Sequence, residues 1–403
     1  MIEQAERSYE DGVMSAPWWR RLLLAVMVAV AEAGCAASPM LPAQAPAPFF
    51  ITFEKGERAA CCGLALVGEG GVVVVGRADT VAGRSWAWAS KFSRLGSTEW
   101  ELDWSSSREN SDLFAAAAVD RGAVIATGAI GVRGSEGSPP RQGGLIVKIG
   151  PTGSLVWTRT LDLGEWTEVR GVMSDGTGGV VIAGTFQDQP NVWSLFMARV
   201  TGGGDVSQSM VIAQDRDRGV RAVHGVAGHG YVMISGSGDV IRLDSAGRFR
   251  WRRVVGDAMD AVVLPDGSLI VVSYSGDETS GAELLRLDPH GDKVWERRLK
   301  HSAFCARSGA WIWARRGDGV IVAGNSCDRS GSLWFAVVTG SGEERLTRRV
   351  LVSPKSGALR VRPGANGSVL AAGMFLQDDS PDARKGWLFS SERILSGGIN
   401  LLD

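Results

Sequence analysis

The chain has 403 residues, of which 44% are hydrophobic and 54 are glycine, so it can bury a large core in a structure rich in turns. Its 43 basic and 44 acidic residues leave a formal charge of −1, which excludes the basic footprint of a nucleic-acid-binding protein and also an acidic tail. No long stretch after residue 35 has the 3.6-residue period of an amphipathic helix, and we therefore predict an all-β protein.

Residues 1–34 have the composition of an export signal. A short cationic segment ends at Arg20 and Arg21, and the apolar run that follows, residues 22–31, is too short to span a bilayer as a stable helix. Because acidic residues before Met14 do not fit such a segment, Met14 is an alternative start of the protein. The sequence predicts export, with residues 1–34 removed as a signal peptide.

The end of this signal allows two routes of processing. Residues 31–35, Ala-Glu-Ala-Gly-Cys, are similar to the lipobox of bacterial lipoproteins, which implies that Cys35 is acylated and becomes the first residue. A large aliphatic residue is usual where Glu32 stands, and the same stretch also suits ordinary cleavage after Ala33. Residues 35–48 form a Pro/Ala-rich tether, which favours a lipid-anchored protein of the cell envelope, at the outer membrane.

A unit of four short strands recurs through residues 49–403. In one full copy, residues 144–186, the strands alternate apolar and polar residues and are joined by Gly-rich turns. The apolar strand that closes each unit recurs about every fifty residues and ends at Gly76, Gly128, Gly184, Gly236, Ser273, Gly324 and Gly373. Because one four-stranded sheet cannot bury both of its faces, this period predicts stacked or radially repeated sheets.

We therefore predict a single seven-bladed β-propeller made of four-stranded antiparallel blades. The last unit lacks a Trp-bearing fourth strand, while residues 49–54 precede the first unit with the spacing of such a strand. We expect this N-terminal strand to complete the seventh blade and to remove an exposed edge. The alternative is an additional strand on the first blade.

Tryptophan recurs near the centre of the fourth strand, four residues after a glycine, at Trp100, Trp157, Trp251 and Trp295. We expect these rings to pack between neighbouring sheets instead of stacking on a ligand. Residues 242–251 and 286–295 share the pattern Arg-Leu-Asp-x-x-Gly-x-x-x-Trp. In this pattern the chain resembles bacterial secreted β-propeller proteins, the group that includes PQQ-like propellers and the seven-bladed repeats of bacterial lipoproteins.

This resemblance covers about residues 49–394 and implies the fold but no activity. The cofactor and calcium residues of PQQ-dependent dehydrogenases have no counterpart that we can place in the sequence, so the cofactor stays open. The histidines come from different units and form no HxH or HxxxH pair, which argues against a metal centre. They are His224, His229, His290 and His301.

The cysteines beyond Cys35 are even in number, as in many exported proteins with disulfides. Cys305 and Cys327 flank the first two strands of the sixth unit, and we predict a disulfide between them. Cys61 and Cys62 are adjacent, which allows either a vicinal disulfide or two buried thiols.

Loops of unequal length suggest where a ligand binds. The loop at residues 129–143 is long and the loop at residues 236–238 is minimal, which predicts a notch on one face. The residues of this predicted binding face are Arg133, Arg141, Asp215 and Asp217. The alternative is that long loops only tolerate insertions.

The functional hypothesis is a non-catalytic binding or scaffold module whose partner is a protein or an envelope glycan. The alternative is an enzyme with its site in the central channel, either a quinoprotein-like oxidoreductase or a polysaccharide lyase or hydrolase. Such a site would gather carboxylates, arginines and tyrosines, and the chain has only Tyr9, Tyr231 and Tyr274.

Overall fold

The computed structural model describes residues 49–391 except for short gaps. The gaps are residues 81–83, 105–109, 133–140, 191, 216–218, 227–229, 275–280, 300–303, 316–318, 327–331, 353–355, 364–367 and 378–379. The predicted signal peptide and tether, including Cys35, lie outside the described residues. Residues 44–403 form one compact unit, and all strands described below belong to it.

The described part of the chain is built of β-strands, with two short 3-10 turns, η1 (Gly68–Gly70) and η2 (Asp120–Gly122). Three sheets have four strands each. The first is β14 (Val220–Val226), β15 (Gly230–Ser235), β16 (Val240–Leu243) and β17 (Phe249–Arg253). The second is β18 (Ala258–Val263), β19 (Leu269–Tyr274), β20 (Ala282–Leu287) and β21 (Lys293–Arg298). The third is β22 (Phe304–Ala314), β23 (Val320–Ser326), β24 (Ser332–Val338) and β25 (Glu344–Leu351).

The other two sheets have eight strands each. One contains, in order, β26 (Ser356–Pro363), β27 (Val369–Gln377), β28 (Ser380–Ser391), β2 (Arg58–Val67), β3 (Gly71–Asp79), β4 (Ser85–Phe92) and β5 (Thr98–Trp104), with β1 (Phe49–Phe53) paired to β28. The other contains β13 (Val206–Asp215), β12 (Val192–Val200), β11 (Val180–Gln189), β10 (Trp166–Ser174), β8 (Arg141–Ile149), β7 (Val124–Val132) and β6 (Ser111–Ala118), with β9 (Leu155–Leu161) paired to β8.

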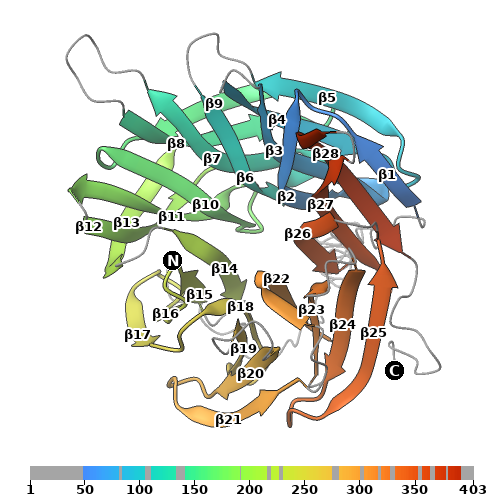
Figure 1. The fold of residues 1–403 in the computed structure, drawn as a ribbon. Helices are drawn as coiled ribbons and strands as arrows, with labels where there is room; N and C mark the ends of the chain where they lie inside the picture. The colour runs from blue at the N-terminus through green and yellow to red at the C-terminus, as the bar shows by residue number, and fades with distance from the viewer. Residues whose placement is uncertain are drawn as a thin grey trace, which may run out of the picture. The chain divides into compact units, whose positions relative to one another are not determined.

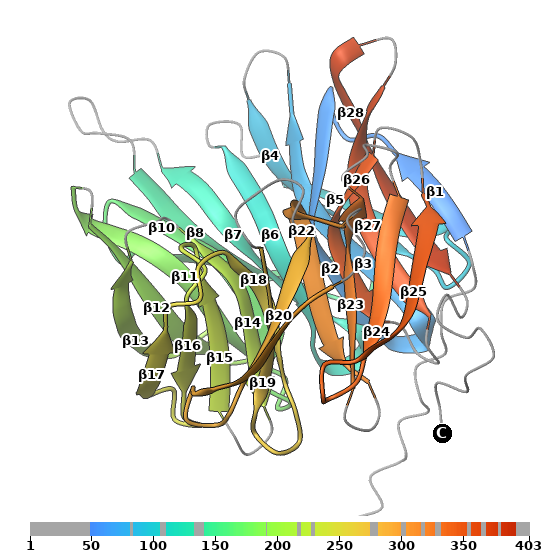
Figure 2. The ribbon, with the colours of Figure 1, turned by 60° about the horizontal axis from the view of Figure 1, so that its bottom comes forward.

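The sheets are arranged radially, as a β-propeller (Figure 1). Neighbouring inner strands contact one another in a closed ring, and the turned view shows these strands side by side (Figure 2). The strands of this ring are β2, β6, β10, β14, β18, β22 and β26. The radial, all-β part of the prediction is therefore confirmed.

The predicted number of separate blades is wrong. Hydrogen bonding divides the described strands into five sheets, not seven, because each eight-stranded sheet joins two four-stranded meanders. The joins are single parallel pairs, Arg58 with Arg384 and Trp166 with Gln142. Each join consists of one residue pair, and hydrophobic periodicity carries no signal for a single pair.

The predicted closing strand is corrected for the same reason. β1 pairs antiparallel with β28, from Phe49 opposite Ser390 to Phe53 opposite Gly386. However, β28 also pairs with β2 through Arg384. The N-terminal strand therefore belongs to a continuous eight-stranded sheet and does not complete a separate seventh blade.

A steric contact explains why the repeated apolar strand ends at a glycine. A Cβ atom on Gly76, Gly128 or Gly184 would lie 1.8–2.0 Å from a carbonyl oxygen of the adjacent inner strand. The inner strand comes this close beside a shift in pairing register, which is the mark of a β-bulge. In β15 and β19 the equivalent register position is taken by a serine, Ser235 or Ser273. The predicted end of the apolar strand at Gly236 is therefore one residue late.

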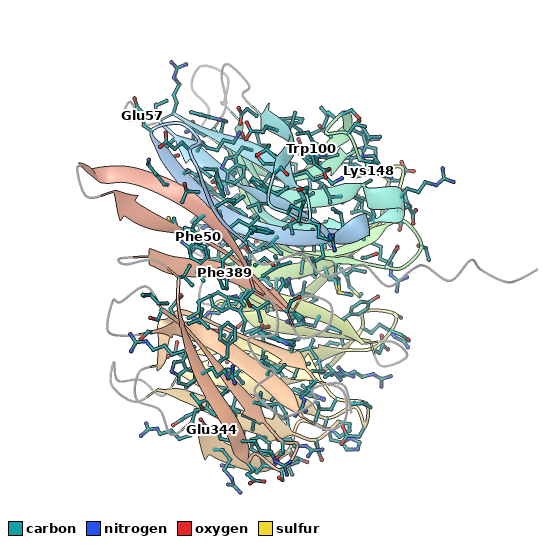
Figure 3. The ribbon with its side chains drawn as sticks, turned by 90° about the vertical axis from the view of Figure 1, so that its right-hand side faces the viewer. Phe50, Glu57, Trp100, Lys148, Glu344 and Phe389 are labelled. Atoms are coloured by element: carbon teal, nitrogen blue, oxygen red, sulfur yellow. The ribbon has the colours of Figure 1, made fainter. Side chains whose placement is uncertain are left out.

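The fourth-strand tryptophans join neighbouring repeats. Each indole Nε1 donates a hydrogen bond to a backbone carbonyl in the equivalent hairpin turn of the next repeat, and a glycine of that turn lies against the ring. The hydrogen bonds are Trp100 to Pro151 (2.9 Å), Trp157 to Gly202, Trp251 to Pro289 and Trp295 to Gly340 (each 3.0 Å). These rings are half-buried against apolar clusters between the sheets, as predicted, and Trp100 is labelled in Figure 3.

Candidate functional site

The inner strands enclose a cavity of about 940 Å³. This volume lies in the usual range of small-ligand pockets, roughly 300–1,000 Å³. Its walls come from β2, β6, β10, β14, β18, β22 and β26, with Arg77 of β3 and Gln142 of β8 at its edge. The cavity is therefore assembled from strands that are far apart in the sequence.

The β-bulges supply much of the cavity lining. Six inner strands have a register shift around one residue, and in each case that residue lines the cavity. These bulge residues are Cys62, Phe114, Arg170, Arg221, Met259 and Leu359. A bulge leaves its extra residue outside the strand ladder. The repeat thus holds the backbone constant and varies the side chain presented to the cavity.

The cavity is richer in positive charge than the chain as a whole. Five arginines and three carboxylates line it, an excess of two positive charges among these residues, whereas the whole chain has a formal charge of −1. The arginines are Arg77, Arg170, Arg221, Arg360 and Arg362, and the carboxylates are Asp112, Glu168 and Asp260.

Arg170 is fixed on both sides. Its Nε donates a hydrogen bond to Glu168 at 2.7 Å, and its guanidinium lies 4.5 Å from the ring centre of Phe114. Glu168 also accepts a hydrogen bond from the Gln142 side chain at 2.9 Å. Burial lowers the pKa of Arg170, although Cys62 and Asp112 act in the opposite direction. The charge of Arg170 is therefore held in one position at the cavity wall.

Arg77 and Asp112 form a second charged group. The Arg77 Nε lies 2.5 Å from Asp79 and 3.4 Å from Asp112. Burial raises the pKa of Asp112, and the neighbouring Asp79 adds to the rise, while Arg77 and Arg170 lower it. Burial and Asp79 outweigh the two arginines, so the pKa of Asp112 lies above its usual value.

The positive charge of Arg360 has weaker partners than that of Arg170. Its Nε donates a hydrogen bond to the backbone carbonyl of Cys62 at 2.9 Å. Burial lowers its pKa and the nearby Arg362 lowers it further, while Asp260 and Cys62 act in the opposite direction. Within the described residues, no ion pair joins Arg360 or Arg362 to a carboxylate.

His224 and Asp260 form a pair across two sheets. The His224 Nε2 lies 2.5 Å from Asp260, which also accepts backbone hydrogen bonds from Ala261 and Ile312. Burial raises the pKa of Asp260, but His224 and the backbone donors outweigh it and leave the pKa below its usual value. Asp260 is therefore an ionised residue that fixes β14, β18 and β22 around the cavity.

The two adjacent cysteines are free thiols, so the vicinal disulfide is excluded. Cys61 is buried and its Sγ donates to the Gly373 carbonyl at 3.1 Å. Cys62 lines the cavity, and burial raises its pKa to about 11 despite the nearby Arg360. Its thiol is protonated near neutral pH and is therefore a poor nucleophile.

The structure places only part of the predicted binding face. Arg141 begins β8 and is exposed, and Asp215 ends β13 opposite Trp193. Arg141 does not line the cavity. Arg133 and Asp217 lie outside the described residues, so the predicted notch stays a prediction.

The predicted disulfide also stays a prediction. Cys305 pairs in register with Asn325 across β22 and β23, and Cys327 lies outside the described residues. Tyr231, one of the tyrosines weighed in the enzyme hypothesis, accepts a hydrogen bond from Arg199 at 3.0 Å and does not line the cavity. Among the side chains that the structure describes, no three His, Cys, Asp or Glu residues are grouped to hold a metal ion.

Sequence reasoning missed the cavity residues. The one available signal was the glycine at the end of the repeated strand, because it marks where an inner strand bulges.

No helix in the described ranges has the length and apolar character needed to cross a membrane.

Comparisons with known proteins agree on the fold. No family model matches the sequence, and no curated protein matches it significantly. Two solved structures are similar. YCF48 bound to D1 peptide has a TM-score of 0.52 and 13% identity, with 88% of this chain and 99% of that chain covered. The Pan2 WD40 domain of Neurospora crassa has a TM-score of 0.50 and 12% identity, with 86% and 92% covered. At these identities the similarity supports the β-propeller fold alone, and nothing in it is specific to PQQ-like proteins.

Proposed function

We propose that this protein is a non-catalytic binding module, and that its central cavity binds a segment of a protein partner. The bulge residues carry this proposal. Six strands of the same design present a thiol, a phenyl ring, two guanidiniums, a thioether and an isobutyl group to one cavity. Variation of side chains on a constant backbone suits recognition of an irregular surface.

The chemistry of the cavity favours binding over turnover. Cys62 has a pKa of about 11, so it is not activated. The Nε2 atom of His224 is engaged by Asp260 at 2.5 Å. The described lining therefore contains no nucleophile with an adjacent general base, which a hydrolase of the covalent type requires.

A protein is the partner class that the comparisons favour. One similar structure, YCF48, is a complex with a peptide, and 88% of this chain matches it. Propeller proteins use one rigid scaffold for many partners, so we transfer only the class of ligand and not its identity.

We further propose that the protein is exported and held at the cell envelope by a lipid on Cys35. The cationic segment, the apolar run and the lipobox-like residues 31–35 support this, and residues 36–48 have the Pro/Ala-rich composition of a tether. The two parts of the proposal are independent, because the cavity could bind a partner with or without an anchor.

The cavity is tested by filling it. Leu359→Trp adds bulk at a bulge residue, whereas Leu351→Trp adds the same bulk at a residue that is 66% exposed on β25. We expect proteins that co-purify with the tagged wild-type protein in fixed ratio to be lost with Leu359→Trp and kept with Leu351→Trp. Equal recovery with both variants would show that the cavity is not the binding site.

The anchor is tested by Cys35→Ser. We expect the wild-type protein to sediment with membranes and to carry a diacylglyceryl mass on its first residue, and the variant to be released as soluble protein. An unmodified wild-type protein with its N-terminus at Gly34 would instead support ordinary cleavage after Ala33.

A further inference from the structure

Most cavity arginines are engaged by the protein itself. Arg77 pairs with Asp79 at 2.5 Å, and Arg170 pairs with Glu168 at 2.7 Å. Arg221 donates to the Ala258 carbonyl at 2.9 Å. The positive charge of these side chains is at least partly compensated, so the excess charge of the cavity lies elsewhere.

Arg360 and Arg362 carry that excess. Both belong to β26 and line the cavity. The printed contact of Arg360 uses only its Nε, at 2.9 Å from the Cys62 carbonyl, and no described residue accepts a hydrogen bond from its terminal nitrogens. A guanidinium with two free terminal amino groups presents the fork geometry that matches a carboxylate.

We propose that Arg360, supported by Arg362, binds a carboxylate of an acidic peptide segment that enters the cavity. This inference rests on the proposed function, since it assumes that the cavity is the binding site. It adds the chemical class of the ligand. Asp260 acts on both cations electrostatically but forms no ion pair with either, so an anion would supply the close partner that they lack among the described residues.

The lining favours a peptide with isolated carboxylates over a densely charged polymer. Asp112, Glu168 and Asp260 line the same cavity and would repel an anion that carries charge at every position. A peptide can place one carboxylate at Arg360 and apolar side chains against Met259 and Leu359.

The aromatic residues also argue against a sugar. Arg170 covers Phe114 at 4.5 Å, and Trp311 is only 7% exposed. Two of the three aromatic side chains of the lining therefore offer little open ring surface for a sugar to stack on, and the third, Trp166, is half-buried.

The test uses a fluorescein-labelled peptide, Ala-Glu-Ala-Ala-Glu-Ala, and the same peptide with glutamine at both glutamates. Binding is measured by fluorescence anisotropy with the full-length mature protein. The variants are Arg360→Gln and, as a matched control, Arg253→Gln, because Arg253 is exposed on β17 and does not line the cavity. Thermal unfolding of each variant checks that the fold is kept.

We expect the wild type and Arg253→Gln to bind the acidic peptide equally, and Arg360→Gln to bind it roughly ten- to hundredfold more weakly, as expected for a lost charge-assisted hydrogen bond. The affinity of the wild type for the glutamine peptide should not exceed the affinity of Arg360→Gln for the acidic peptide. Equal binding by all three proteins, or no binding by the wild type at millimolar peptide, would overturn the inference.

Two further measurements separate this inference from the proposed function. If polygalacturonate displaces the peptide at equal carboxylate concentration, a polymeric glycan is the better ligand and the peptide assignment is wrong. If Leu359→Trp loses the co-purifying partner while Arg360→Gln keeps it, the cavity is the binding site but the carboxylate assignment fails. If both variants keep the partner, the proposed function itself fails.

Discussion

Replacing Trp295 with alanine is expected to lower the free energy of unfolding by about 3 kcal/mol, at the lower end of the range for large aromatic side chains because the ring is half-buried. Trp295 lies on β21 and packs against the apolar cluster that joins β19 and β20 to the sheet of β22–β25. Its Nε1 donates to Gly340 at 3.0 Å. In the described residues no backbone ladder joins these two sheets, so side chains such as Trp295 hold them together.

The neighbouring residue provides the control for this prediction. Val294 is the unpaired residue at a register shift between β20 and β21, and it is 55% exposed. We expect Val294→Ala to change the free energy of unfolding by less than about 0.5 kcal/mol. The change in the free energy of unfolding for Trp295→Phe should lie between those two values, because phenylalanine keeps most of the buried ring and loses the hydrogen bond. Denaturant unfolding of the three variants measures these differences, and a similar loss for Trp295→Ala and Val294→Ala would contradict the account.

Replacing Gly184 with alanine is expected to cost about 3 kcal/mol of stability, at the upper end of the range for overpacking. The new Cβ atom would lie 2.0 Å from the Glu168 carbonyl oxygen, far inside van der Waals contact. Either β10 or β11 must move. Because Arg170 is the bulge residue of β10, the same change should also displace Arg170 and Glu168 at the cavity wall. Thermal unfolding measures the first effect.

Gly357 is the matched control. It lies on the inner strand β26, and a Cβ atom there would meet no atom within 4 Å. We expect Gly357→Ala to be neutral to within about 0.5 kcal/mol. Ser235 and Ser273 carry a Cβ at the register position of Gly184, so the cost depends on how closely each inner strand approaches. A neutral Gly184→Ala would mean that β10 can retreat without loss.

Much of the local structure could be predicted from the sequence. The alternation of apolar and polar residues located most strands, and glycines located the turns between them, because both signals depend on neighbouring residues. The positions of Trp100, Trp157, Trp251 and Trp295 between repeats were predicted for the same reason, since each follows a turn glycine at a fixed spacing.

The sheet count and the candidate site could not be predicted in this way. The pairs Arg58–Arg384 and Trp166–Gln142 each merge two meanders through one residue pair, which leaves no mark on the hydrophobic period. The predicted binding residues were chosen from loop lengths, whereas the cavity residues lie inside strands. A bulge moves one side chain out of the alternating pattern, and a regular period of two cannot show it.

The sequence by itself determined that this protein is a radial array of β-strands with a repeated glycine and a repeated tryptophan, because these features arise from contacts within one repeat or between adjacent ones. Only the tertiary structure decided which sheets are continuous and which side chains meet at the centre. Arg170, Asp260 and Arg360 belong to three different inner strands, and only closure of the ring of inner strands places them in one cavity. Closure depends on backbone approach between distant segments, which no local pattern encodes.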